Sequence, residues 1–230
     1  MANDPSNPTP PGQQAANSDF AHLVQEESVE HYFDLKYLAP PRMASFGYQV
    51  RLLCQNFPPK SDVLEIGAGP GLVTSLLRQL GMTVKTLDVD DRLNPTITAS
   101  ITEIPLADNV VDCFLCCQVL EHLAWDVVPA ALAELRRVSG GGVLSVPSNR
   151  PTYVLIRHNH RSRSGHRRIE LGSRSGKPVK GTRDGHYWEL DSNVTTPSFR
   201  KLLVDAGFTI EQELRPFENL YHHFFVVHKR

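Results

Sequence analysis

The sequence has no apolar run long enough to cross a bilayer, and no basic stretch followed by an apolar one opens the chain. We therefore expect neither a membrane-spanning helix nor a secretory signal peptide, and no membrane partner. The formal net charge is only −1, from 24 Lys and Arg against 25 Asp and Glu, which predicts no general binding of polyanions. A single cytoplasmic domain fits these absences, because 230 residues can bury one good core.

Cysteine is also scarce, and the four that occur have neither disulfide-framework nor zinc-ligand spacing: Cys54, Cys113, Cys116 and Cys117. Three of them fall within one apolar segment that we expect to form a strand, over 110–117. Alternation along a strand sends neighbouring side chains to opposite faces, so Cys116 and Cys117 cannot act together. We interpret these cysteines as core residues of a protein in a reducing compartment.

The most informative stretch is Val63–Gly71, which reads VLEIGAGPG. It predicts a short buried strand that enters a glycine-rich turn, followed by a helix from about Leu72 to Leu80. Such a unit binds nucleotide-like ligands, because glycines permit the tight turn and let the ligand approach the backbone. A dinucleotide fingerprint would need a third glycine at position 72, where this chain has leucine.

Two acids flank the turn. Glu65 lies inside the first strand, and Asp88 ends a second strand, 83–87, at a point 21 residues past Gly67. An acid at that distance can accept hydrogen bonds from both ribose hydroxyls of a bound nucleoside. The pair resembles motifs I and II of the class I S-adenosylmethionine-dependent methyltransferases.

Later segments strengthen this resemblance in chain order. The stretch 102–123 (TEIPLADN…QVLEHL) is similar to the "LPFPDNSFDVV…VLEHL" segment of the type 11 small-molecule methyltransferases, and 135–147 (LRRVSGGGVLSVP) resembles their fifth-strand region. The resemblance covers roughly 45–150 and 186–230. It implies an α/β fold: a Rossmann-like, seven-stranded, mostly parallel sheet with helices on both faces. The last strand, near 222–228, would run antiparallel.

The resemblance also implies how the cofactor, S-adenosylmethionine, is held. Glu65 would face its methionine ammonium, Asp88 its ribose hydroxyls and Val89 its adenine. Gln118 would lie near the reactive sulfur. The family often has an acid after the third strand, but Ser100 and Ile101 occupy the matching positions here, so the Ser100 hydroxyl or backbone groups would recognise adenine. The turn residues would supply backbone contacts: Gly67, Ala68, Gly69 and Gly71.

The domain has two further parts in this interpretation. Residues 1–18 are rich in Pro, Asn, Gln and Ala, which predicts a disordered tail ahead of one methyltransferase domain, 19–230. Residues 19–55 would form a helical cofactor cover with a break at 39–41. Tyr32, Tyr37 and Arg42 could line it, or could be ordinary packing residues.

The segment 150–185 is a basic insertion near the expected substrate site. Ten Arg and Lys lie between Arg150 and Arg183 against a single acid, so the rest of the chain is net acidic. This favours a small acceptor that carries a carboxylate or phosphate, although a solvated loop would explain the composition equally well. We name as candidate substrate contacts Arg157, His158, His160 and Tyr187.

Methyl transfer to a hydroxyl or protonated amine benefits from a general base, and histidine suits that role near neutral pH. His122 follows the fourth strand at the carboxyl edge of the sheet, and His186 opens a stretch that lines the substrate side in several relatives. These two are the candidate catalytic residues, although each could instead be structural.

Several alternatives stay open. The basic insertion could hold RNA or a nucleotide, or the chain could be an inactive methyltransferase-like binding module. The (Asn/Asp)-Pro-Pro-aromatic turn of adenine-N6 enzymes and the Pro-Cys nucleophile of cytosine-C5 enzymes are both missing. No metal site is expected, because His222 and His223 would face opposite ways in a strand and no third ligand accompanies His158 and His160.

Overall fold

The computed structural model describes the following residues: 32, 34–150, 152–157, 165–170 and 185–230. Three predicted features lie wholly or partly outside these described residues. They are the tail 1–18, the first part of the cofactor cover (19–31 and 33), and the insertion positions 151, 158–164 and 171–184.

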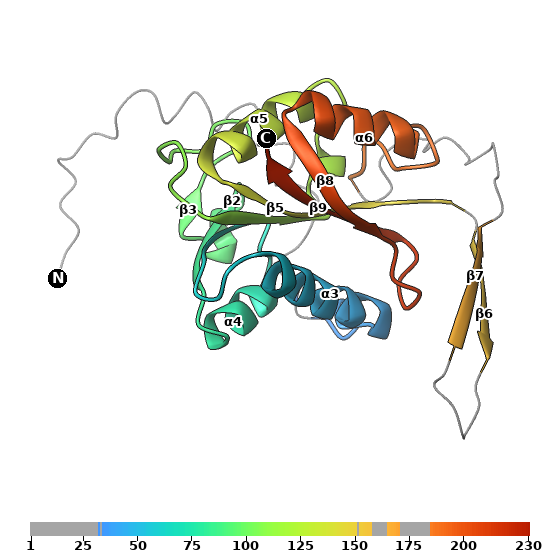
Figure 1. The fold of residues 1–230 in the computed structure, drawn as a ribbon. Helices are drawn as coiled ribbons and strands as arrows, with labels where there is room; N and C mark the ends of the chain where they lie inside the picture. The colour runs from blue at the N-terminus through green and yellow to red at the C-terminus, as the bar shows by residue number, and fades with distance from the viewer. Residues whose placement is uncertain (1–31, 33, 151, 158–164, 171–184) are drawn as a thin grey trace, which may run out of the picture.

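Seven strands form one sheet in the order β3-β2-β1-β4-β5-β9-β8 (Figure 1). Their bounds are β1 Asp62–Ile66, β2 Thr83–Asp88, β3 Ile97–Thr98, β4 Cys113–Cys117, β5 Gly141–Pro147, β8 Phe208–Leu214 and β9 His222–Lys229. The first five strands pair in parallel, whereas β9 runs antiparallel to both β5 and β8. This confirms the predicted fold class, with the last strand reversed.

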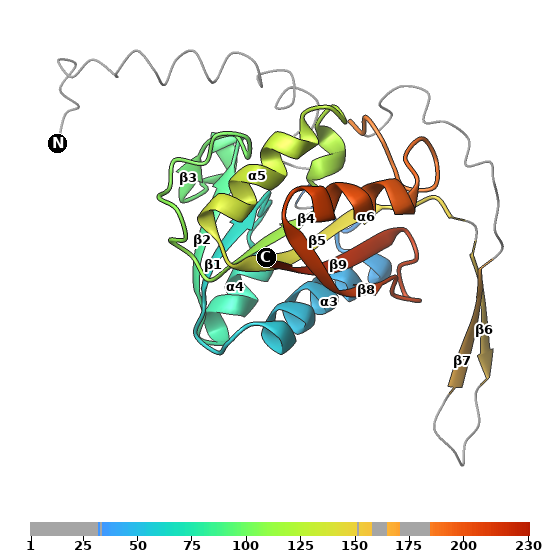
Figure 2. The same cartoon turned by 45° about the horizontal axis from the view of Figure 1, so that its top comes forward.

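Two helices cover each face of the sheet, as Figures 1 and 2 show. On one side lie α3 (Pro40–Asn56) and α4 (Leu72–Gln79), and on the other α5 (Val128–Val138) and α6 (Thr196–Asp205). In α5 the apolar residues recur at helical spacing and form the buried stripe: Val128, Ala131, Leu132, Leu135 and Val138. Full burial of each leucine or valine contributes about 1.5–3 kcal/mol, so this stripe holds α5 on the sheet.

Local signals set where the helices begin and end. Helix α3 starts at the predicted break, where Pro40 and Pro41 occupy first-turn positions that need no N–H partner. Thr195 caps α6 by accepting a hydrogen bond from the Ser198 N–H at 3.2 Å, and Gly207, with φ of +88°, follows its end. These capping residues agree with the sequence pattern.

Strand β4 begins three residues later than its apolar run. The chain turns at Asn109, whose φ is +53°, and Val111 forms only an isolated bridge to Ser139 before regular pairing starts. Along β4 the side chains alternate as expected: Cys116 packs in the core beneath α5 and α6, while Cys117 faces the other side. All four cysteines are free.

The basic insertion contains a hairpin that the sequence did not predict. Its strands, β6 (Thr152–Arg157) and β7 (Gly165–Glu170), pair antiparallel in a separate two-stranded sheet that projects from the main sheet in both views (Figures 1 and 2). Arg215 anchors its base by donating to the Thr152 hydroxyl at 3.0 Å and to the Arg150 carbonyl at 3.1 Å. Within the described ranges, no helix combines the length and apolar character needed to cross a membrane.

Candidate active site

The glycine-rich turn joins β1 to α4 through left-handed backbone. Gly67, Gly69 and Gly71 have φ of 66°, 52° and 74°, angles that other residues adopt only with strain. A Cβ on Gly67 would also meet Val119 Cγ2 at 2.5 Å. The Gly67 N–H donates to the Leu87 carbonyl at 2.9 Å, which ties the turn to β2. The turn therefore exposes backbone rather than side chain to its surroundings.

A cavity of about 510 Å³ opens where β1 and β4 end. The connections that follow the neighbouring strands β1 and β4 lead to helices on opposite faces of the sheet, and such a switch point is where open α/β sheets bind ligands. Six of the candidate cofactor-binding and catalytic residues line this cavity: Glu65, Gly67, Ala68, Gln118, His122 and His186.

Glu65 is the buried acid of this cavity, with 4 % of its surface exposed. It accepts a short hydrogen bond from the Thr74 hydroxyl on α4. Burial raises the pKa of Glu65 to about 7, although the Thr74 bond and the charge of Arg78 oppose the shift. A positively charged ligand group beside Glu65 would favour its ionised form, which is what a methionine ammonium provides.

The predicted ribose and adenine residues lie beside the cavity rather than in its lining. Burial raises the pKa of Asp88, whose Oδ1 accepts from the Asp90 N–H at 3.1 Å. The Ser100 hydroxyl bonds to that of Thr102 at 2.8 Å, and Ile101 is a core residue with 4 % exposure. The lining also does not include Gly69, Gly71 or Val89. Contacts of these residues with the cofactor stay predictions.

Gln118, at the end of β4, has a φ of +58°. Its N–H donates to the Ser145 carbonyl at 2.9 Å and its side-chain amide donates to the Ser145 hydroxyl at 3.2 Å. Residues other than glycine seldom take this conformation, and they concentrate at functional sites. The turn after β4 thus directs the following residues, Leu120–His122, back toward the cavity as the short helix η3.

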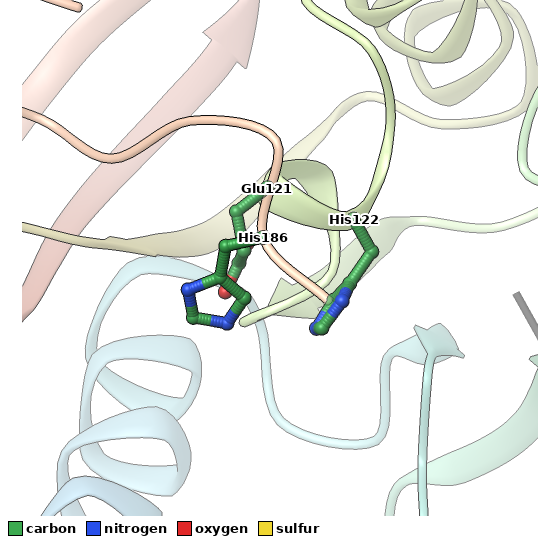
Figure 3. A group of neighbouring side chains, drawn as sticks. All are labelled: Glu121, His122 and His186. Carbon is green, nitrogen blue, oxygen red and sulfur yellow. The ribbon is translucent and has the colours of Figure 1, made fainter. Parts of the chain in front are cut away.

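Two histidines from distant parts of the chain meet at the cavity. His122 ends η3, while His186 comes from the loop that precedes α6 (Figure 3). Their ring centroids are 4.9 Å apart with planes at 77°. His122 Nδ1 donates to the Gly185 carbonyl at 3.2 Å, and the Tyr187 N–H donates to the Glu121 carbonyl at 2.8 Å. Sequence analysis named both histidines without anticipating their contact.

Glu189 orients His186. Its carboxylate accepts from His186 Nδ1 at 2.9 Å, from the Tyr221 hydroxyl at 2.5 Å and from the Asn149 amide. Burial alone would raise the pKa of Glu189, but these hydrogen bonds outweigh it and hold the pKa below its ordinary value. The carboxylate is therefore ionised and fixes the His186 ring. The signal in the sequence was its spacing, three residues after His186.

Glu121 was not named from the sequence, although it stands next to His122. It is fully buried, and within the described part of the chain neither of its carboxyl oxygens has a hydrogen-bond partner. Burial raises the pKa of Glu121 to about 8, opposed by the nearby His186. An unpaired buried carboxyl is costly and calls for an explanation.

The segment before β1 supplies further residues that line the cavity. Tyr32, Lys36, Tyr37 and Arg42 line it, and the Arg42 guanidinium carbon lies 4.3 Å from the centre of the Tyr37 ring. His222, at the start of β9, also lines the cavity, although the sequence suggested no such role. Tyr32 and Tyr37 lie against the glycine turn, because a Cβ on Gly69 would meet the Tyr37 hydroxyl at 3.2 Å and the Tyr32 ring at 3.4 Å.

The structure does not bring the predicted substrate contacts together at the cavity, unlike the two histidines. Tyr187 is 42 % exposed and does not line the cavity. Arg157 ends β6 in the projecting hairpin, and His158 and His160 lie outside the described residues. Their role in substrate binding therefore stays a prediction.

Comparison with known proteins bears on the family and the fold. Residues 64–146 match a family model described as a methyltransferase domain. No curated protein sequence matches the chain significantly.

Among solved structures, three similar ones have TM-scores between 0.54 and 0.58. The 1,6-didemethyltoxoflavin-N1-methyltransferase of Burkholderia thailandensis, solved with S-adenosylhomocysteine, is 18 % identical (TM-score 0.58) over 99 % of this chain and 93 % of its own. A glycopeptide N-methyltransferase is 13 % identical (TM-score 0.55) over 79 % and 88 %. The magnesium protoporphyrin IX methyltransferase of Synechocystis PCC 6803 is 14 % identical (TM-score 0.54) over 83 % and 84 %.

The family match spans β1 to β5, which includes the glycine turn and Gln118. The structural likeness extends the shared fold to the reversed strand β9. Residues 64–146 therefore match the methyltransferase-domain family, and the chain shares the fold of methyltransferases solved with S-adenosylhomocysteine.

Proposed function

We propose that this methyltransferase moves the methyl group of S-adenosylmethionine to an oxygen or nitrogen of a small, carboxylate- or phosphate-bearing acceptor. The observation that carries the proposal is the two-walled cavity. One wall has the features of a cofactor site, with Glu65 and the glycine turn, and the other presents His122 and His186. A methyl donor and an acceptor held between such walls can react in line.

The cofactor's sulfonium carries an activated methyl group, so the protein mainly binds and orients. In our proposal the backbone of Gly67 and Ala68 receives the methionine end, Glu65 pairs with its ammonium, and Asp88 holds the ribose. Arg42 is the candidate partner for the methionine carboxylate, because it lines the cavity and stacks on Tyr37, which lies against Gly69 of the turn.

The acceptor would enter from the side of His186. Among the described lining residues Glu65 is the single acid, whereas Lys36 and Arg42 are cationic. This balance favours an anionic acceptor. His186 is our candidate for the residue that acts on the acceptor's proton, because the ionised Glu189 orients its ring as in other carboxylate–histidine pairs.

Calorimetric titration with S-adenosylhomocysteine tests the cofactor half of the proposal. We expect micromolar binding by the unmodified protein and a loss of about 100-fold in Asp88→Ala, because two hydrogen bonds to a charged group disappear. Asp91→Ala is the matched control: Asp91 is exposed, belongs to the short helix η2 (Asp91–Leu93) and should leave the affinity unchanged.

Failure of the unmodified protein to bind would contradict the proposal and favour an inactive methyltransferase-like module. Binding of RNA that weakens steeply with salt would instead favour the nucleic-acid alternative, because phosphate contacts release counterions.

A further inference from the structure

Three potential metal ligands converge beside the cofactor cavity. Glu121, His122 and His186 each offer one ligand atom, and these atoms all lie within 4.8 Å of one another (Figure 3). Glu121 and His122 are neighbours on η3, whereas His186 arrives from a loop far along the chain. The two histidines also line the cavity, so the cluster borders the space where the acceptor would sit.

The buried carboxylate of Glu121 is the first observation that indicates a bound cation beside the two histidines. Its side chain is 0 % exposed, and neither oxygen finds a hydrogen-bond donor within the described residues. Buried charges in proteins are paired or coordinate metals, because an isolated one is expensive to remove from water. A cation between Glu121 and the two rings would supply the missing partner.

The hydrogen bonds of the histidines are the second sign. His186 Nδ1 donates to the Glu189 carboxylate at 2.9 Å, and His122 Nδ1 donates to the Gly185 carbonyl at 3.2 Å. Each acceptor fixes the ring's tautomer, with the lone pair on Nε2. Metal-binding histidines are oriented in this way, by a carboxylate or backbone carbonyl on the far nitrogen.

We propose that Glu121, His122 and His186 bind one divalent transition-metal cation, such as Zn²⁺ or Co²⁺, with open coordination positions toward the cofactor cavity. Two imidazole nitrogens and one carboxylate are a ligand set that such cations favour at sites with room for substrate. Bonds of about 2.0–2.2 Å would draw the three side chains closer together than they lie now.

The site specifies the acceptor class and deepens the proposed function, on which this part of the inference rests. A hydroxyl oxygen that binds the cation loses its proton to water in the cavity more readily. An electron pair of that oxygen then forms the C–O bond to the methyl carbon while the C–S bond breaks. The electron pair of the C–S bond stays on sulfur, which turns the sulfonium into a neutral thioether. In this arrangement His186 favours loss of the proton by holding the cation and does not itself take the proton, and a hydroxyl is favoured over an amine.

Other histidine pairs provide the controls. His222 lines the cavity while His223 Nε2 bonds to Glu213 at 2.7 Å on the opposite face of β9, so these neighbours cannot share a cation. His158 and His160 belong to the insertion, away from η3 in sequence. His223→Gln and the double variant His158→Gln/His160→Gln are therefore matched controls.

The test uses the full-length, tag-free chain after treatment with a chelator. Zn²⁺ binding is measured by calorimetry and Co²⁺ binding by its visible absorption bands. S-adenosylhomocysteine is titrated into the metal-free protein in parallel. We expect one cation per chain, a loss of affinity of about 100-fold in Glu121→Gln and in His186→Gln, and no change in the two controls. Thermal unfolding checks that each variant folds.

The outcomes separate the two proposals. The inference is overturned if the metal-free protein binds S-adenosylhomocysteine but no cation. It is also overturned if Glu121→Gln keeps full cation affinity, or if only the His158→Gln/His160→Gln variant loses it. Cation binding without cofactor binding supports the site and contradicts the proposed function.

Discussion

The wall of the cavity that we assign to the cofactor, the cofactor wall, comes from one stretch of chain, residues 62–79. The wall that we assign to the acceptor, the acceptor wall, comes from four separate segments. These are Gln118–His122, Asn149, His186–Glu189 and Tyr221–His222. The first wall works mainly through backbone geometry at the glycine turn. The second works through a network of side chains that becomes visible only when the chain is folded. We therefore expect substitutions to disrupt the first wall by straining its backbone, and the second wall by removing hydrogen-bond partners.

The largest effect should come from Gly67→Ala. Its φ of +66° and the approach of Val119 to 2.5 Å leave no room for a methyl group. We expect the free energy of unfolding to fall by about 2 kcal/mol or more and cofactor affinity to fall by about 100-fold. Denaturant unfolding and calorimetry with S-adenosylhomocysteine measure both.

Gly47→Ala is the control for that change. Gly47 lies inside α3, and a Cβ there meets nothing within 4 Å. This substitution should stabilise the protein by about 0.5–1 kcal/mol. If Gly67→Ala bound the cofactor as well as Gly47→Ala does, backbone geometry would not govern the cofactor wall.

A smaller effect, confined to stability, is expected on the acceptor wall. Glu189→Ala removes the acceptor shared by His186, Tyr221 and Asn149, so all three donors lose this partner. The free energy of unfolding should fall by about 2 kcal/mol, whereas affinity for S-adenosylhomocysteine should change by less than about threefold.

Glu211→Ala, an exposed acid on β8, should change stability by less than about 0.5 kcal/mol. Equal losses of cofactor affinity and stability in Glu189→Ala would show that the two walls are not separable.

The smallest effect concerns pH and the cofactor wall alone. Burial raises the pKa of Glu65 to about 7, and pairing with the methionine ammonium requires its ionised form. The protein must therefore release a proton on binding below that pH. Affinity for S-adenosylhomocysteine should fall about tenfold from pH 8 to pH 6, and Glu65→Gln should bind weakly with a flat profile over that range. A flat profile in the unmodified protein would exclude this pairing.

The backbone of the glycine turn could be predicted from the sequence, because its signals are local, whereas the cofactor contacts stay predictions. The glycines of the turn Gly67–Gly71 indicate positive φ angles by their residue type, and Asp88 follows at a characteristic spacing in the sequence. The direction of the strands also followed from the resemblance, including the reversed β9, whereas their order in the sheet was not predicted.

The acceptor wall could be predicted only in part. His122 and His186 were recognised singly, but their contact depends on the fold of a long intervening segment. Nothing local distinguishes Glu121 as buried, since an acid after a strand is usually solvated. Strands β6 and β7 were missed because β7 contains two arginines and a single β-branched residue, Ile169, so its composition does not indicate a strand.

Hydrogen bonds fix the chain to the domain at both ends of the basic insertion. Before it, the Asn149 N–H donates to the Leu190 carbonyl at 2.9 Å and the Asn149 side chain bonds to Glu189. After it, the Gly185 carbonyl holds His122. The two ends are fastened to the domain independently of what lies between them. The segment between these two points could therefore be replaced by one of another length and composition, while the contacts of Asn149 and Gly185 with the domain are kept.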